Sequence, residues 1–328
     1  MAQAYAGPSV KGPPFRTIAD IIAGETGDLR TVPILLQEGI TGDSVARTAA
    51  LLDGIYIDRG PRCWQLTSRP RSMSHVIADS WERKLDLLEE QWGTDLNGLV
   101  IPLLGPWTFS TRIEHSAGRR ALEDQGFLAA LHDIYVASLE QVHDNIAQRF
   151  GTSPHLVLVE PDLYRIQHGL IPGPTDFDLI PERSAEDLAD YLAELCHNER
   201  GGTRILSFSH FPICWDIARF SGARVVDFDF AAIRHHSDLD GLGELLNCHV
   251  TPSVAVDPTG KQPKDLAKEI IRLSTTVGFA PTLWAKQGFL RMVDSSTDSA
   301  VLEELAFAQQ LRTVAQTADI LHSDAGNL

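Results

Sequence analysis

The chain has 328 residues, of which 43% are hydrophobic and 22% are charged, a composition that is typical of a folded globular protein and excludes a disordered one. Its 28 basic and 44 acidic residues give a net charge of −16, which disfavours binding to nucleic acid and to anionic membranes. No apolar run reaches the ~18 residues of a membrane span, the N-terminus lacks the pattern of a signal peptide, and the four cysteines form no CxxC pair, so we expect a cytoplasmic protein with reduced thiols.

Apolar runs and helical patterns alternate along the chain. Helices are predicted at residues 119–150, 184–198, 214–220, 238–246, 263–273 and 300–315, where apolar side chains recur every three or four positions. Strands that are apolar throughout indicate a parallel sheet buried on both faces, and six are predicted at residues 99–104, 155–160, 204–208, 225–230, 249–256 and 282–285. Two more strands are expected at residues 3–6 and within 54–67, the latter as a hairpin.

Eight strand–helix repeats in about 300 residues favour a (β/α)8 barrel over an open doubly wound sheet. No GxGxxG motif follows a predicted strand, and no low-complexity linker divides the chain. We therefore predict a single barrel domain over residues 1–328, with a disordered tail at 319–328. In such a barrel, catalytic and binding side chains lie at the C-terminal ends of the strands.

Polar side chains cluster after several predicted strands, most densely in the segment 203–230. This segment places Ser207, Ser209, His210 and Cys214 around the end of one strand. The next strand ends with Asp227 and Asp229, which alternate and so share one face. Two unpaired carboxylates are costly to bury, so we expect Asp229 to reach the mouth of the barrel.

Several short motifs give the chain a family resemblance. They are Gly7-Pro8-Ser9, Gly105-Pro106-Trp107-Thr108, Glu160-Pro161 and the segment 203–230. In this order they resemble the catalytic domain of cobalamin-independent methionine synthase. The segments GDSVARTAALL and WQLTSRP are similar to those of short single-domain actinobacterial methionine-synthase-like proteins. The resemblance implies a barrel of the methionine synthase/uroporphyrinogen decarboxylase-like type. It also implies a zinc ion that binds homocysteine as a thiolate, which is then methylated from a folate carrier.

The residues that the resemblance assigns to the zinc site are mostly replaced. The family's His-x-Cys falls on Ser207-Phe208-Ser209, its glutamate ligand on Asp229, and its remote cysteine on Gln287. Its Asp-Glu-Pro becomes Val159-Glu160-Pro161, and its Asp-x-His-Ser becomes Val256-Asp257-Pro258-Thr259, without the histidine. Three of the four metal ligands and the proton donor are therefore missing, and no zinc or other cofactor is expected. The alternative is a relocated metal site made of His210, Cys214 and Asp229, joined by His235 or His236.

We accordingly predict a methionine-synthase-like barrel that has diverged from methyl transfer to homocysteine. Glu160 and Asp229 are the predicted catalytic residues, and the predicted substrate-binding residues are Ser9, Trp107, Ser207, Ser209 and His235. The expected ligand is a small molecule, amino-acid-like or folate-like. For three of these residues a purely structural role is the alternative. Glu160 would be a carboxylate paired with Arg112 or Arg165, Trp107 would pack in the core, and His235 would be a solvated loop residue.

Two further functions stay open at this stage. One is a non-catalytic or repurposed barrel that binds a small ligand or a protein partner. The other is zinc-free decarboxylase-like chemistry, which would need arginines at the mouth such as Arg112, Arg165 or Arg234.

Overall fold

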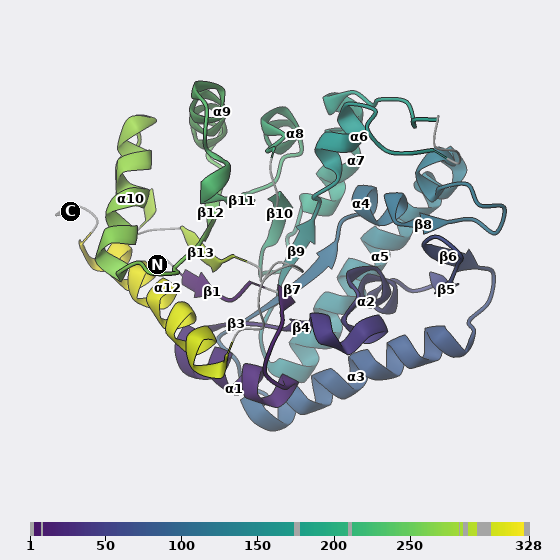
Figure 1. The fold of residues 1–328 in the computed structure, drawn as a ribbon, viewed down its shortest axis with the longest axis horizontal. Coiled ribbons are helices and arrows are strands. Elements are labelled where there is room, and N and C mark those ends of the chain that lie inside the picture. The colour runs from purple at the N-terminus through teal and green to yellow at the C-terminus, as the bar shows by residue number, and fades with distance from the viewer. Residues whose placement is uncertain are drawn as a thin grey trace.

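Eight parallel strands form a nearly closed barrel at the centre of the molecule (Figure 1). The computed structural model describes residues 3–7, 9–173, 178–208, 212–281, 283–284, 288–293 and 303–324. In spatial order the strands are β1 (Gln3–Tyr5), β13 (Phe289–Met292), β12 (Thr251–Val256), β11 (Val225–Asp229), β10 (Arg204–Phe208), β9 (His155–Val159), β7 (Gly98–Leu104) and β3 (Leu29–Thr31). The Thr31 hydroxyl of β3 donates to the carbonyl of Ala6, 3.0 Å away, and so joins the two edge strands.

A helix follows each barrel strand and covers its outer face, which confirms the predicted fold class (Figure 1). The eight helices are α1 (Phe15–Thr26), α3 (Ser72–Trp92), α5 (Gln125–Phe150), α7 (Ala185–Cys196), α8 (Trp215–Phe220), α9 (His236–Asn247), α10 (Pro263–Thr276) and α12 (Glu304–Asp324). The predicted start of α7 is confirmed, because the Ser184 hydroxyl accepts a hydrogen bond from the Asp187 amide. None of the described helices has the length and apolarity required to cross a membrane.

Short elements lie in the loops that follow β1, β3, β7, β9 and β11. After β1 and β3 come β2 (Ser9–Val10), β4 (Ile34–Leu35), the 3-10 helix η1 (Leu36–Gly42) and α2 (Ser44–Leu51). A small separate sheet contains β5 (Tyr56–Arg59), β6 (Trp64–Thr67) and β8 (Ile113–Glu114). The remaining short helices are α4 (Pro106–Thr111), η2 (Ala121–Glu123), α6 (Leu163–Gln167) and η3 (Phe230–Ala232).

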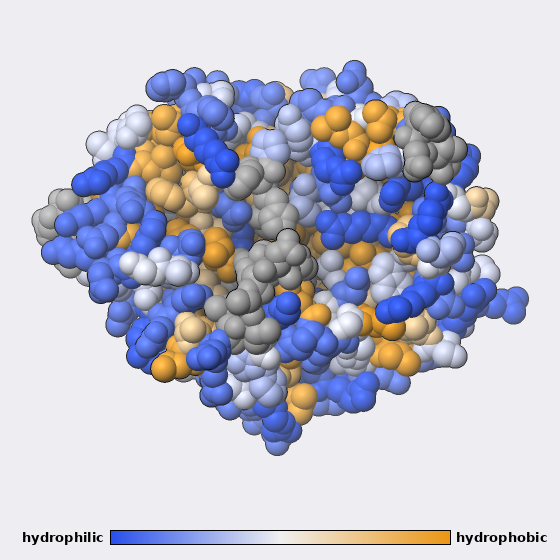
Figure 2. All heavy atoms as spheres, in the orientation of Figure 1, coloured by the Kyte–Doolittle hydropathy of each residue, from blue (hydrophilic) through white to orange (hydrophobic). Residues whose placement is uncertain are grey.

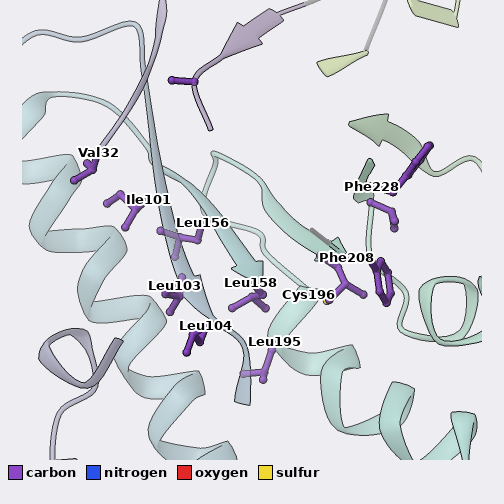
Figure 3. Close-up of a cluster of buried hydrophobic side chains, with 14 of the residues drawn as sticks. Val32, Ile101, Leu103, Leu104, Leu156, Leu158, Leu195, Cys196, Phe208 and Phe228 are labelled. Atoms are coloured by element: carbon purple, nitrogen blue, oxygen red, sulfur yellow. The ribbon is translucent and has the colours of Figure 1, made fainter. Parts of the chain in front are cut away.

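Alternation along the strands divides the core into two parts. Leu156 and Leu158 of β9 point outward with Leu103 of β7 and pack against helix side chains such as Leu195 of α7 (Figure 3). A second cluster takes one side chain from each of seven strands, and only the inside of the barrel can bring these together. Its members are Tyr5, Leu29, Val100, Val157, Ile205, Val225 and Phe289.

Three predictions about individual elements are wrong. Residues 54–67 do form a hairpin, but it pairs with β8 outside the barrel, and the second barrel strand is the three-residue β3. The last strand is β13 rather than residues 282–285, because Leu283 and Trp284 are helical. The disordered tail predicted from residue 319 is helical as far as Asp324, since Leu321 and Ala318 of α12 are buried in the core.

Candidate functional site

A buried carboxylate, Asp227 of β11, organises the polar part of the barrel interior. It is 0% exposed and lies in register with Ser207 of β10 on one side and Ser253 of β12 on the other. The Ser207 hydroxyl donates to its Oδ2 at 2.7 Å, and the Ser253 hydroxyl donates to its Oδ1 at 2.7 Å. Each neighbouring strand thus provides a hydrogen-bond donor to one carboxylate oxygen of Asp227. A buried charged group needs such partners.

Arg291 of β13 supplies the positive charge that this carboxylate needs. Its guanidinium is only 2% exposed, and its Nε lies 3.2 Å and 3.1 Å from the two oxygens of Asp227. Its Nη2 donates to Oδ1 of Asp229 at 3.2 Å. A single buried cation therefore bridges both aspartates of β11. Opposite charges at this range inside a protein attract strongly.

Tyr5 of β1 closes the interior network on its remaining side. Its hydroxyl lies 2.9 Å from the Ser253 hydroxyl and 3.3 Å from Oδ1 of Asp227. Burial, and then the charge of Asp227, raise the pKa of Tyr5 well above its ordinary value. The phenol therefore stays protonated and serves as a hydrogen-bond donor. We call this group of side chains the interior polar network; its members are Tyr5, Ser207, Asp227, Asp229, Ser253 and Arg291.

The predicted site residues fall into different places. Ser207 and Asp229 belong to the interior polar network, and Asp229 is the last residue of β11, partly exposed at the C-terminal end of the barrel. Ser9 is half-buried in β2. His235 is exposed and forms the N-cap of α9, with its backbone amide donating to Asp238 at 2.8 Å. Ser209 and His210 lie outside the described residues.

Glu160 lies against the first turn of α4, with backbone amides rather than Arg112 or Arg165 as its hydrogen-bond partners. Its carboxylate is 1% exposed and accepts hydrogen bonds from the amides of Trp107 at 2.9 Å and Thr108 at 2.7 Å. These amides belong to the first turn of α4, where helix N–H groups lack internal partners. Burial raises the pKa of Glu160 to about 7, against the lowering effect of these hydrogen bonds. Arg112 and Arg165 instead pair with Asp162, at 3.2 Å and 3.4 Å.

Trp107 is buried between α4 and α7. The side chain is buried, its indole nitrogen donates to the carbonyl of Leu188 at 3.1 Å, and its ring centroid lies 4.6 Å from that of Tyr191. The guanidinium of Arg183 lies 5.2 Å from the same ring. These contacts fix α4 against α7, and they leave packing as the role that the geometry supports.

Replacing Gly105 with alanine is expected to lower the free energy of unfolding by about 1–3 kcal/mol. A Cβ at this position would lie 2.3 Å from Oε1 of Glu160, so the carboxylate would have to move away from the α4 amides. The buried N–H groups of Trp107 and Thr108 would then lose their acceptor. Gly24→Ala is the matched control, since nothing lies within 4 Å of its added Cβ in α1. That variant should gain about 0.5–1 kcal/mol. Urea denaturation of both would test this, and equal changes in the two variants would contradict it.

The donor set that the structure describes does not fit the zinc ion that the resemblance implies. No group of three or more His, Cys, Asp or Glu side chains among the described residues is arranged to hold a metal ion. Ser207 is already bonded to Asp227, and Arg291 neutralises the carboxylates around it. Cys214 is buried in the core, and burial raises its pKa to about 12, which disfavours the thiolate that binds metals. Gln287, like His210, lies outside the described residues.

Sequence reasoning missed Arg291, the residue that completes the interior polar network. The sequence does indicate that Asp227 belongs to the site, because it alternates with Asp229 in the run VVDFD. Arg291 also had a signal, as a single charge within FLRM, but the strand was expected seven residues earlier. A lone arginine inside an otherwise apolar strand predicts an interior ion pair once its strand is known.

Comparison with known proteins supports the fold and nothing finer. No protein-family model and no curated protein matches the sequence. Among solved structures, a B12-independent methionine synthase from Shewanella sp. W3-18-1, in complex with selenomethionine, matches with a TM-score of 0.63. The match covers 100% of both chains at 10% sequence identity. The chain therefore has the fold of a methionine-synthase-like barrel, as the motifs predicted.

Proposed function

We propose that this protein is a methionine-synthase-like barrel that has diverged from zinc-dependent thiol methylation and binds a small amino-acid-like ligand at its C-terminal mouth. The observation that carries the proposal is the guanidinium of Arg291, fixed between Asp227 and Asp229. A cation built into the protein occupies the interior among the strands to which the resemblance assigns zinc ligands. Metal-assisted formation of a thiolate is then not the chemistry that these side chains support.

Asp229 is the member of this network placed to meet a ligand. It ends β11 and is partly exposed, whereas Asp227 and Arg291 are sealed inside the barrel. A carboxylate at a strand end attracts an ammonium group, which an amino acid carries. The neighbour of known structure was solved with selenomethionine, so methionine is the first ligand to try. The four cysteines are unpaired, which supports work in a reducing compartment such as the cytoplasm.

A small ligand is favoured over a protein partner by the surface on the side drawn in Figure 2. Outside the grey atoms, hydrophobic residues on this face form separate patches between hydrophilic ones. Homodimer interfaces are more apolar than ordinary protein surface, so this face does not favour a permanent partner of that kind.

Zinc content tests the first half of the proposal. Protein purified without a histidine tag or chelator is expected to contain much less than one zinc per chain, and added zinc should leave its melting temperature unchanged. About one tightly held zinc per chain would overturn the proposed divergence. In that case Cys214→Ala would show whether the metal occupies the relocated site.

Ligand binding tests the second half. Methionine, homocysteine and folates are added in turn, and we expect an amino acid to raise the melting temperature of the wild type. Asp229→Asn should abolish this rise. Asp257→Asn, which changes an exposed carboxylate just beyond the end of β12, should keep it. Binding that survives in Asp229→Asn would remove Asp229 from the site.

A further inference from the structure

Arg47 of α2 is a buried cation whose guanidinium has no hydrogen-bond acceptor in the part of the chain that the structure describes. Its side chain is 5% exposed, and its Nη1 and Nη2 atoms are both buried with no hydrogen-bond acceptor among the described residues. Burial lowers the pKa of Arg47 to about 9, with no carboxylate acting to raise it. An unpaired buried charge is among the most destabilising features that a protein can carry, so such a group calls for a partner.

The charged groups that also lie at this part of α2 and α3 have other partners. Lys84 of α3, also buried, lies 2.5 Å from Oε2 of Glu38 and donates to the carbonyl of Thr41 at 3.1 Å. Burial lowers the pKa of Lys84, Glu38 acts against this, and the positive charge of Arg47 adds a further lowering effect. Glu38 is thus the partner of Lys84, and Asp43 caps the first turn of α2 through hydrogen bonds from the Val45 and Ala46 amides. Arg47 is the charged group at this junction of η1, α2 and α3 whose guanidinium has no acceptor among the described residues.

The position of Arg47 connects it to open space. Its guanidinium carbon lies 5.8 Å from the ring centroid of Trp81. Trp81 also lines a cavity of about 930 Å³ between α3, α5 and the segment that joins α2 to β5. The next residue, Thr48, accepts a hydrogen bond at 2.9 Å from the amide of Leu104, which ends β7. The ring of Trp81 therefore lies between Arg47 and the cavity. The helix that carries Arg47 is bonded to the C-terminal end of a barrel strand through Thr48.

We propose that Arg47 binds a small oxyanion group, a carboxylate or a phosphate, that supplies the hydrogen-bond acceptors its guanidinium lacks. A guanidinium presents two parallel N–H donors to the two oxygens of such a group, and neither buried Nη atom of Arg47 has an acceptor among the described residues. This site is separate from the interior polar network and goes beyond the function proposed above.

Anion-dependent stability tests the proposal. The melting temperatures of the wild type and Arg47→Met are measured in sodium chloride, sodium acetate and sodium phosphate at equal ionic strength. A bound ligand at a hundred times its dissociation constant raises the melting temperature of a chain of this size by about 4 °C. We expect such a rise for the wild type in acetate, in phosphate or in both, and none for Arg47→Met. A rise in phosphate alone assigns the site to phosphate groups, and a rise in acetate assigns it to carboxylates.

Two further variants sharpen the result. Arg149→Met removes an arginine that lines the same cavity but is held by Glu82, Asp86 and Glu89, and it should keep the anion-dependent rise. Arg47→Lys keeps the charge without the forked donors and should show a smaller rise. The proposal is overturned if the wild type and Arg47→Met respond equally to anions, or if neither responds.

Discussion

Replacing Arg291 with methionine is expected to lower the free energy of unfolding by about 3–5 kcal/mol. The variant would leave the carboxylate of Asp227 fully buried with only the hydroxyl donors of Ser207, Ser253 and Tyr5. Removing one partner of a buried ion pair is costly because the remaining charge can neither reach water nor find another counter-ion. The loss is read from urea denaturation as a lower midpoint.

Two comparisons separate this effect from a general loss of charge. Arg16→Met makes the same chemical change in an exposed pair, where Arg16 lies 2.7 Å from Glu90, and should cost no more than about 1 kcal/mol. The double variant Asp227→Asn with Arg291→Met should lose less than the two single variants added together, because the second change removes the stranded charge. Additive losses, or a loss at Arg291 as small as that at Arg16, would show that the two side chains are not coupled.

Replacing Glu160 with glutamine is expected to change how stability depends on pH. The pKa of Glu160 is raised from 4.5 to about 7 in the folded protein, chiefly because the carboxyl is buried. Between these values the folded protein holds a proton that the unfolded chain has released, so stability falls as pH rises. The contribution is fully present below about pH 4.5 and is lost as pH rises through about 7. It amounts to about 3 kcal/mol.

The measurement is the free energy of unfolding of both proteins at several values between pH 4 and 8. Glutamine keeps one oxygen acceptor for the amides of α4 but carries no charge to desolvate, so its curve lacks this fall. The difference between the variant and the wild type should therefore move in favour of the variant by about 3 kcal/mol across the range. Two parallel curves would mean that Glu160 has the same proton affinity in the folded and unfolded chains.

The long central strands could be predicted from the sequence because their environment is uniform. Strands β7 and β9 are buried on both faces, so almost every side chain in them is apolar. The same criterion failed for β3 and β13, which are short and carry Arg30 and Arg291. It also placed the last strand wrongly, at residues 282–285. Trp284 in this run is buried, but it belongs to the core cluster outside the barrel interior and not to a barrel strand.

The candidate site was predicted in part, and the reason lies in how each residue is partnered. Ser207 and Asp229 were correctly placed near the end of their strands, because position in a strand is a local property. Whether Glu160 meets a ligand or caps a helix depends on α4, which comes more than fifty residues earlier in the chain. No local pattern records such a pairing.

The sequence by itself determined the alternation of buried strands and helices, and hence the (β/α)8 barrel, because apolar periodicity reports burial one segment at a time. Only the tertiary structure decided what the polar residues do. It brought Arg291 against Asp227, 64 residues away, and enclosed Arg47 without an acceptor in the part of the chain that it describes. Charges inside a protein are governed by their nearest counter-ion and by exclusion of water, and both are set by segments that are distant in sequence.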